Sequence, residues 1–94
     1  MAFHVLFSRQ AKKQLAAIEL KQRRMILAWV GSHLEGCENP RGVDGSKQLK
    51  GTKAGWRYRV GSYRILATIQ DEELVIDVVR VGHRQGVYSD LPKM

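Results

Sequence analysis

The sequence is poor in cysteine and contains no long apolar run. A single cysteine, Cys37, leaves no partner for an intramolecular disulfide, as is typical of proteins from a reducing cytosol. No stretch approaches the roughly 20 apolar residues of a membrane-spanning helix, and the first residues lack the charged and then apolar pattern of a signal peptide. These absences predict a cytoplasmic protein with no membrane partner.

Sequence motifs for metals, cofactors and the common hydrolases are absent as well. The chain has no phosphate-binding glycine loop, no zinc-ligand spacing and no visible Ser-His-Asp arrangement. Its three histidines, His4, His33 and His83, are too scattered to indicate a metal site. We therefore expect neither a metal nor a cofactor.

Positive charge is the most prominent property of the chain. Its 16 lysines and arginines stand against 9 acidic residues, which gives a formal net charge of +7 over 94 residues. Residues 45–70 contain no Asp or Glu, whereas the basic residues among them are Lys47, Lys50, Lys53, Arg57, Arg59 and Arg64. A surface that only kept the protein soluble would mix both signs. The cluster therefore indicates an anionic partner, either nucleic acid or an acidic protein.

The pattern of apolar residues predicts one domain that spans residues 1–94. The length suffices for a single core, and 44% hydrophobic residues are ordinary for a globular protein. Periodicity predicts strands at 3–7, 56–60, 63–69 and 74–81, helices at 9–20 and 21–35, and a loop at 37–55. We therefore predict an α+β domain of order β-α-α-β-β-β, with a helical hairpin packed on a mostly antiparallel sheet.

The two predicted helices carry recognisable end signals. Ser8 is a suitable N-cap for the first helix, and Gly36 is a suitable stop for the second. Within the second helix, Leu27, Val30 and Leu34 recur at i, i+3 and i+7, so we expect these three side chains to face the core.

Residues 56–60 have the alternation of a half-buried strand. Trp56 and Tyr58 alternate with Arg57 and Arg59, so one face of the strand is apolar and the other carries guanidinium groups. We expect both aromatic side chains to pack in the core. The two arginines then lie on the opposite face of the sheet.

A tight turn is predicted directly after this strand. The pair Gly61-Ser62 suits a two-residue type II′ hairpin, which would set Arg59 opposite Arg64 on one face. Like charges placed directly across a ladder destabilise a sheet, and a local rule broken in this way suggests a functional surface. We expect an anion to bind there.

Metal-free cleavage of RNA is a reaction that these residue types would suit. It needs cations to stabilise the crowded phosphorane, a proton acceptor for the attacking 2′-OH and a proton donor for the leaving oxygen. Guanidinium forks match phosphate oxygens and supply the cations. The candidates are Arg57, Arg59, Arg64 and Arg84 for the charge, with His83 and Tyr88 for proton transfer.

Three short motifs occur in order along the chain. They are Leu49-Lys50-Gly51, Tyr63-Arg64-Ile65-Leu66, and Val81-Gly82-His83-Arg84 followed after two residues by Val87-Tyr88. With these motifs and the β-α-α-β-β-β order, almost the whole chain resembles the RelE/ParE toxin superfamily. RelE-type members cleave mRNA in the ribosomal A site and are neutralised by an acidic antitoxin from the same operon. ParE-type members share the fold but poison DNA gyrase.

The resemblance also implies which residues form the site. The basic residues on the strand after the loop match Arg57 and Arg59, the arginine before the aliphatic run matches Arg64, and the C-terminal motif matches Arg84 and Tyr88.

One difference from RelE itself concerns the general base. RelE carries lysines where this chain has Arg57 and Arg59, and a lysine of lowered pKa can act as a base, whereas arginine stays protonated. We therefore expect His83 to be the base, because histidine ordinarily titrates near neutrality. We expect Tyr88 to donate a proton or to stack on a nucleobase.

The resulting hypothesis is a metal-independent, ribosome-dependent mRNA endoribonuclease that inhibits translation as the toxin of a type II toxin–antitoxin pair. Attack by the 2′-OH would leave a 2′,3′-cyclic phosphate and a 5′-hydroxyl. Lys47, Lys50 and Lys53 would bind RNA, and the partners would be an acidic antitoxin, the ribosome and mRNA. Two alternatives remain open: a ParE-like gyrase inhibitor without catalytic activity, and a basic RNA-binding module that has no activity and needs no antitoxin.

Overall fold

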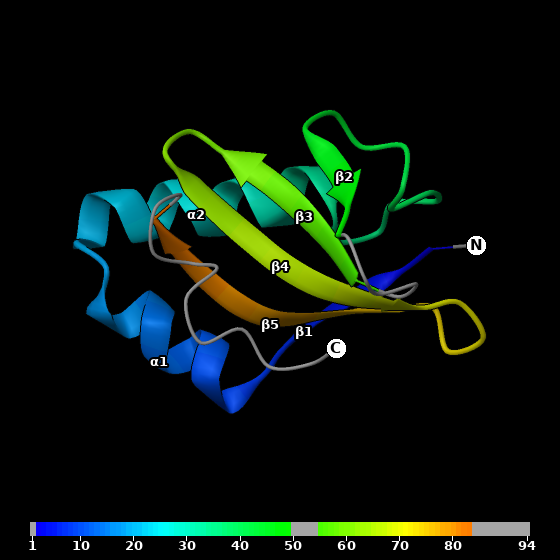
Figure 1. Cartoon of the computed structure of the whole chain (residues 1–94), viewed down its shortest axis with the longest axis horizontal. Helices are drawn as coiled ribbons and strands as arrows, with labels where there is room; N and C mark the ends of the chain where they lie inside the picture. Colours follow the sequence, from blue (N-terminus) through cyan, green and yellow to red (C-terminus); the bar gives the residue numbers. More distant parts are fainter. Residues whose placement is uncertain (1, 50–54, 84–94) are drawn as a thin grey trace.

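The computed structural model describes residues 2–49 and 55–83, in which two helices pack on one face of a five-stranded sheet (Figure 1). The helices are α1 (Arg9–Ala17) and α2 (Leu20–His33). The strands are β1 (His4–Phe7), β2 (Ser46–Gln48), β3 (Gly55–Val60), β4 (Tyr63–Gln70) and β5 (Val75–His83). Neither helix combines the length and the apolar character that a membrane crossing needs. The predicted α+β fold is confirmed.

The sheet has the order β1-β5-β4-β3-β2. Among the described strands, β1 and β5 pair in parallel and the other three neighbouring pairs are antiparallel, so the mostly antiparallel arrangement is also confirmed. The prediction of one unbroken loop over residues 37–55 is wrong, because β2 lies within it. This strand has only three polar residues, Ser-Lys-Gln, and no apolar alternation marks it in the sequence.

The helix ends follow local chemistry. The N-cap prediction for Ser8 is confirmed, since its Oγ accepts a hydrogen bond from the Ala11 amide at 3.0 Å. Gly36 follows α2 with a φ of +81°, which glycine adopts without strain. The predicted core stripe of α2 is partly wrong: Val30 and Leu34 are buried, but Leu27 is 42% exposed. The third core position of the helix is Ile26, which shares the i, i+4, i+8 face.

The β3–β4 hairpin has the register that its turn residues predict. Gly61 takes a φ of +59°, as the first central residue of a type II′ turn requires. Val60 then pairs with Tyr63, and Arg59 pairs with Arg64. The expected like-charge pair across the ladder is therefore present.

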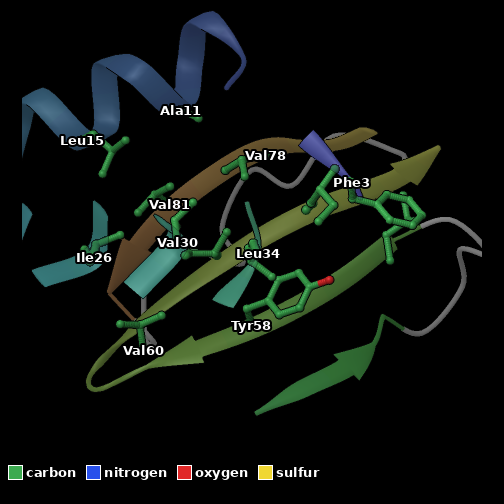
Figure 2. Close-up of a cluster of buried hydrophobic side chains, with 14 residues drawn as sticks. Phe3, Ala11, Leu15, Ile26, Val30, Leu34, Tyr58, Val60, Val78 and Val81 are labelled. Carbon is green, nitrogen blue, oxygen red and sulfur yellow. The ribbon is translucent and has the colours of Figure 1, made fainter. Parts of the chain in front are cut away.

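Both helices and three of the strands, β3, β4 and β5, contribute buried side chains to one core (Figure 2), and half-buried side chains of β1 pack against it. Tyr58 is fully buried there, and its hydroxyl donates a 2.7 Å hydrogen bond to the carbonyl of Pro40. Burial raises the pKa of this phenol. Trp56 is half-buried and packs at the margin of the same cluster, so the aromatic face of β3 is confirmed.

An ion pair attaches the loop before β2 to the turn between β4 and β5. Arg41 Nη1 and Nη2 donate to the two carboxylate oxygens of Asp71 at 2.8 and 2.9 Å, in the two-pronged geometry typical of arginine. This contact lowers the pKa of Asp71 and raises that of Arg41. The Arg41 guanidinium also lies 5.9 Å from the ring centroid of Trp56.

Beyond the end of β1, side chains of α1 and of its N-cap form hydrogen bonds with the exposed edge of β5. The last pair of the parallel ladder is Phe7 with Val78. Beyond it, Ser8 Oγ donates to the Val79 carbonyl at 3.1 Å, and Gln14 Oε1 accepts from the Val81 amide at 2.7 Å. These polar side chains take the place of a neighbouring strand and satisfy backbone groups of β5.

Loss of the Gln14 contact should destabilise the fold. We expect Gln14→Leu to lower the free energy of unfolding by about 1–3 kcal/mol, because the Val81 amide would lose its acceptor in a partly buried position. Gln14→Glu keeps an acceptor oxygen at the same place and should cost less. Urea denaturation of both variants tests this, and equal losses would show that the contact contributes nothing beyond packing.

A second prediction concerns pH and the outer edge of β1. The Glu35 carboxylate accepts a hydrogen bond from the Val5 amide at 3.1 Å and contacts His4 Nδ1 at 3.0 Å. Both contacts lower the pKa of Glu35, and the bond from Val5 has the larger effect. A lowered carboxyl pKa stabilises the fold above the unfolded pKa, and that stability is lost as the pH falls through the folded value.

Glu35→Gln should therefore flatten the acid side of the stability profile. We expect the urea midpoint of the wild-type protein to fall more steeply than that of Glu35→Gln between about pH 5 and about pH 3. The pair Arg41–Asp71 is intact in both proteins and contributes equally to their acid dependence. Parallel profiles would contradict the prediction.

Candidate functional site

The face of the sheet away from α1 and α2 collects basic side chains in two rows, and we call it the arginine face. Residues paired across strands point to the same side of a sheet. The first row crosses β2, β3, β4 and β5 through Lys47, Arg57, Leu66 and Arg80. The second row crosses β3, β4 and β5 through Arg59, Arg64 and Gly82. With neighbouring strands about 4.8 Å apart, the first row extends over roughly 14 Å.

Burial differs strongly along the first row. Leu66 is fully buried although it does not belong to the core cluster, and Arg80 beside it is only 8% exposed. Arg57 is half-buried, and its Nε is inaccessible to solvent and has no hydrogen-bond partner. Lys47, at the sheet edge, is exposed. Charges in a poorly solvated position interact more strongly with an anion than the same charges in water.

The second row lies next to the hairpin turn. Arg64 Nη1 donates to the carbonyls of Gly61 and Tyr63 at 3.0 and 2.9 Å, which holds its guanidinium against the turn. Arg59, directly opposite, is exposed. The β3–β4 turn thus brings two guanidinium groups to one end of the arginine face.

Acidic side chains are scarce on the described strands. Asp77 is the single acidic residue within them, and it pairs with Thr68, on the side of the sheet that Leu66 occupies. Two short ion pairs, His4 with Glu35 and Arg41 with Asp71, lie away from the arginine face. The face therefore presents a net positive surface.

His83 does not share this face. It pairs with Tyr63 at the end of β5, and the two rings meet edge to face at 5.8 Å between centroids. Tyr63 packs against the core cluster, so this pairing places His83 on the side of the sheet that carries the helices. The neighbouring pair, Arg64 with Gly82, belongs to the arginine face.

The structure thus brings together Lys47, Arg57, Arg59 and Arg64 among the residues expected from the sequence. Lys50, Lys53, Arg84 and Tyr88 lie outside the described residues. Arg80 is an additional member that the sequence pattern did not assign. A signal for it exists in the sequence of β5, because regular alternation from Ile76 and Val78 would place a charged residue, Arg80, in the core.

Comparison with known families identifies the class of protein. The profile of the ParE toxin of type II toxin–antitoxin systems, parDE, matches residues 5–88. The chain belongs to this family and so to the RelE/ParE toxin superfamily. No curated protein matches the chain.

Solved structures of RelE toxins share the fold. The archaeal RelE–RelB complex from Pyrococcus horikoshii OT3 is 25% identical, with a TM-score of 0.72 over 93% of this chain and 100% of that chain. The RelB–RelE complex from Methanococcus jannaschii is 27% identical, with a TM-score of 0.68 over 93% and 99%. The isolated RelE toxin of E. coli is 23% identical, with a TM-score of 0.70 over 87% and 84%.

The like-charge pair of the second row should cost stability. We expect Arg59→Gln to raise the free energy of unfolding by about 0.2–1 kcal/mol at low ionic strength, because it removes the repulsion with Arg64. The gain should shrink in high salt, which screens exposed charges.

The matched control for this change is Arg24→Gln, at an exposed position of α2. Its effect should stay within about 0.5 kcal/mol. Urea denaturation at two salt concentrations measures both variants. If Arg59→Gln were less stable than the wild type, the contacts of Arg59 would stabilise the fold by more than its repulsion with Arg64 destabilises it, which would contradict the prediction.

Proposed function

We propose that the protein is the toxin of a type II toxin–antitoxin pair and acts as a ribosome-dependent mRNA endoribonuclease. The observation that carries this proposal is the arginine face, where several guanidinium groups share a surface that could hold a phosphodiester. Membership of the toxin superfamily supports the toxin role, and the likeness to RelE structures supports the nuclease branch. The reaction needs no metal in this proposal.

Arg57, Arg59 and Arg64 would stabilise the phosphorane. The attacking 2′-OH comes from the RNA, and the negative charge that develops on the equatorial oxygens would meet guanidinium donors. The Arg64 guanidinium is held beside the β3–β4 turn, which reduces the reorganisation needed when substrate binds. The products would be a 2′,3′-cyclic phosphate and a 5′-hydroxyl.

Proton transfer would depend on the end of β5 and on the residues after it. We propose His83 as the general base, since arginine cannot accept a proton, and Tyr88 as the proton donor or a stacking platform. Arg84 would add a further cation. His83 follows Gly82, the partner of Arg64, so RNA that curves around the end of β5 would meet both the imidazole and the second row.

The proposed partners are an antitoxin, the ribosome and mRNA, all in the cytoplasm. The Pyrococcus horikoshii and Methanococcus jannaschii structures are complexes of RelE with RelB, which supports an antitoxin for this chain too. An acidic antitoxin segment would cover the arginine face and neutralise it. Lys47, Lys50 and Lys53 would contact RNA phosphates beside the cleavage site.

Inhibition of DNA gyrase is the second candidate function. The family profile that matches the chain is described for the ParE toxin, and this branch of the superfamily needs no catalytic residues. Binding to gyrase would use a protein-binding surface. Loss of guanidinium groups would then change the affinity for gyrase, and neither the wild type nor the variant would cleave RNA.

Primer extension on a reporter mRNA tests the proposal directly. Purified protein should produce cuts at A-site codons in an in vitro translation reaction, and far fewer cuts when ribosomes are absent. A codon whose ribose carries a 2′-O-methyl group should resist cleavage, because its nucleophile is blocked. Arg64→Ala should reduce cleavage by about 100-fold or more, the usual effect of removing one preorganised donor.

The control variant for this assay is Arg24→Ala on α2, which should cut as the wild type does. Cleavage that persisted in Arg64→Ala would remove the proposed site, and cleavage of the 2′-O-methyl codon would remove the proposed nucleophile. Intact mRNA together with gyrase-dependent DNA breaks would favour the second candidate. If neither mRNA cleavage nor DNA breakage occurred and induced expression did not impair growth, the remaining alternative would be an RNA-binding module without activity.

A further inference from the structure

An aromatic contact joins the last residue of β5 to the first residue of β4. Tyr63 and His83 form the final pair of the β4–β5 ladder. Their rings meet edge to face, with 5.8 Å between the centroids and an angle of 79° between the ring planes. The β3–β4 turn and the end of β5 lie at the same end of the sheet (Figure 1). The imidazole of His83 therefore lies against Tyr63 beside this turn.

Backbone pairing and packing both fix the position of Tyr63. The residue directly follows the turn at Gly61-Ser62, and it pairs with Val60 of β3 and with His83 of β5. Its side chain is half-buried and packs against the core cluster. Side chains packed on a dense core have little freedom to move. Tyr63 is therefore a rigid support for its neighbour on β5.

The His83 side chain, in contrast, is exposed and has few contacts. Within residues 2–49 and 55–83, its imidazole forms the ring contact with Tyr63 and takes part in no hydrogen bond or ion pair. An exposed histidine at a strand end can otherwise exchange among several staggered rotamers. An edge-to-face contact favours the rotamer that keeps it by a factor of about 2 to 12. The Tyr63 ring therefore restricts the imidazole to a preferred orientation.

Orientation matters for a general base. The base must come within roughly 2.6–3.2 Å of the oxygen whose proton it removes, and a small displacement of a catalytic group can cost much of the rate. His83 is the proposed acceptor of the 2′-OH proton. In the part of the chain that the structure describes, the contact that limits the direction of its imidazole comes from Tyr63.

We propose that Tyr63 is a positioning residue, whose ring holds the His83 imidazole in the orientation that accepts the proton of the attacking 2′-OH. As this proton moves to the imidazole, the 2′-oxygen bonds to phosphorus and the bond to the 5′-oxygen breaks. The leaving 5′-oxygen takes up a proton, for which Tyr88 is the proposed donor. This inference rests on the proposed function for the role of His83, and it adds a residue that acts only through the imidazole.

The contact belongs to the ring of Tyr63 and not to its hydroxyl. The hydroxyl forms no hydrogen bond with any other described residue. Tyr63→Phe therefore keeps the edge-to-face contact, whereas Tyr63→Leu removes it and still places an apolar side chain against the core. The two variants separate loss of the aromatic ring from loss of the hydroxyl.

Single-turnover cleavage on ribosomes halted at a defined mRNA codon tests the role. We expect Tyr63→Leu to cut about 2- to 12-fold more slowly at saturating protein, the factor that loss of the aromatic contact implies. The protein concentration that gives half of the maximal rate should not change, because Tyr63 does not contact RNA in this proposal. Tyr63→Phe should cut at the wild-type rate.

The matched control is Phe7→Leu on β1. Phe7 is also a half-buried aromatic residue that packs against the core cluster, and it pairs with Val78 instead of His83. Phe7→Leu should therefore cut as the wild type does. An equal loss of rate in Phe7→Leu and Tyr63→Leu would reveal a general packing defect and would overturn the proposal.

A double-mutant cycle shows whether Tyr63 acts through His83. His83→Gln should slow cleavage by about 100-fold or more, as loss of a general base implies. In the His83→Gln background, Tyr63→Leu should cause no further loss, because no base remains to be positioned. A purely structural role would lower the rate by the same factor in both backgrounds. That additive result, or a wild-type rate in Tyr63→Leu, would overturn the proposal.

Nuclear magnetic resonance of the free protein gives a readout that needs no catalysis. Three-bond couplings of His83 should report one dominant χ1 rotamer in the wild type and in Tyr63→Phe. The same couplings should report averaging among rotamers in Tyr63→Leu. Averaged rotamers in the wild-type protein, or a dominant rotamer that persists in Tyr63→Leu, would overturn the proposal.

The outcomes distinguish this inference from the proposed function. If the wild type leaves mRNA on the ribosome intact, the nuclease assignment fails and the positioning role fails with it. If the wild type cuts at A-site codons and His83→Gln is slow but Tyr63→Leu is not, the nuclease assignment stands and only the positioning role fails.

Discussion

The register of the β3–β4 hairpin is the constraint on which the rest of the structure depends. Side chains on a strand alternate between faces, so a slip of one residue would exchange every side chain of β3 between the core and the opposite face. Gly61 fixes the register by adopting a positive φ. Tyr58 reinforces it from the other side of the sheet, because its hydroxyl reaches the Pro40 carbonyl only from the core face.

Strands β3 and β5 both direct arginine side chains to the arginine face, but they do so in different ways. In β3 a regular alternation separates apolar from basic side chains, and the turn then repeats the arrangement at Arg64. In β5 a bulge breaks the alternation, and its extra residue turns Arg80 away from the core. The cost of this arrangement is the repulsion between Arg59 and Arg64. A stable fold alone has no use for such a repulsion, which is one reason for the proposal that the face binds an anion.

Features encoded by neighbouring residues were predictable from the sequence, and features that depend on distant contacts were not. The Ser8 cap and the Gly61 turn are local, and both predictions are confirmed. The position of Arg80 was missed because the bulge depends on pairing with β4 and on contacts with Ser8 and Gln14, more than sixty positions away in the chain. Leu27 was misplaced because two apolar stripes overlap on α2, and only packing selects the one through Ile26. The roles of individual site residues stay predictions.

The parallel pairing of β1 with β5 has a consequence for the order of assembly. The first strand of the chain is joined in the sheet to the last described one, and β5 is bonded on its other side to β4. The first row of the arginine face therefore cannot exist until β5 has been synthesised and inserted between strands that were made earlier. Contacts so far apart in sequence form late and slowly. A chain in which β5 has not yet been synthesised consequently lacks the assembled surface, so the arginine face forms only once all five described strands are available.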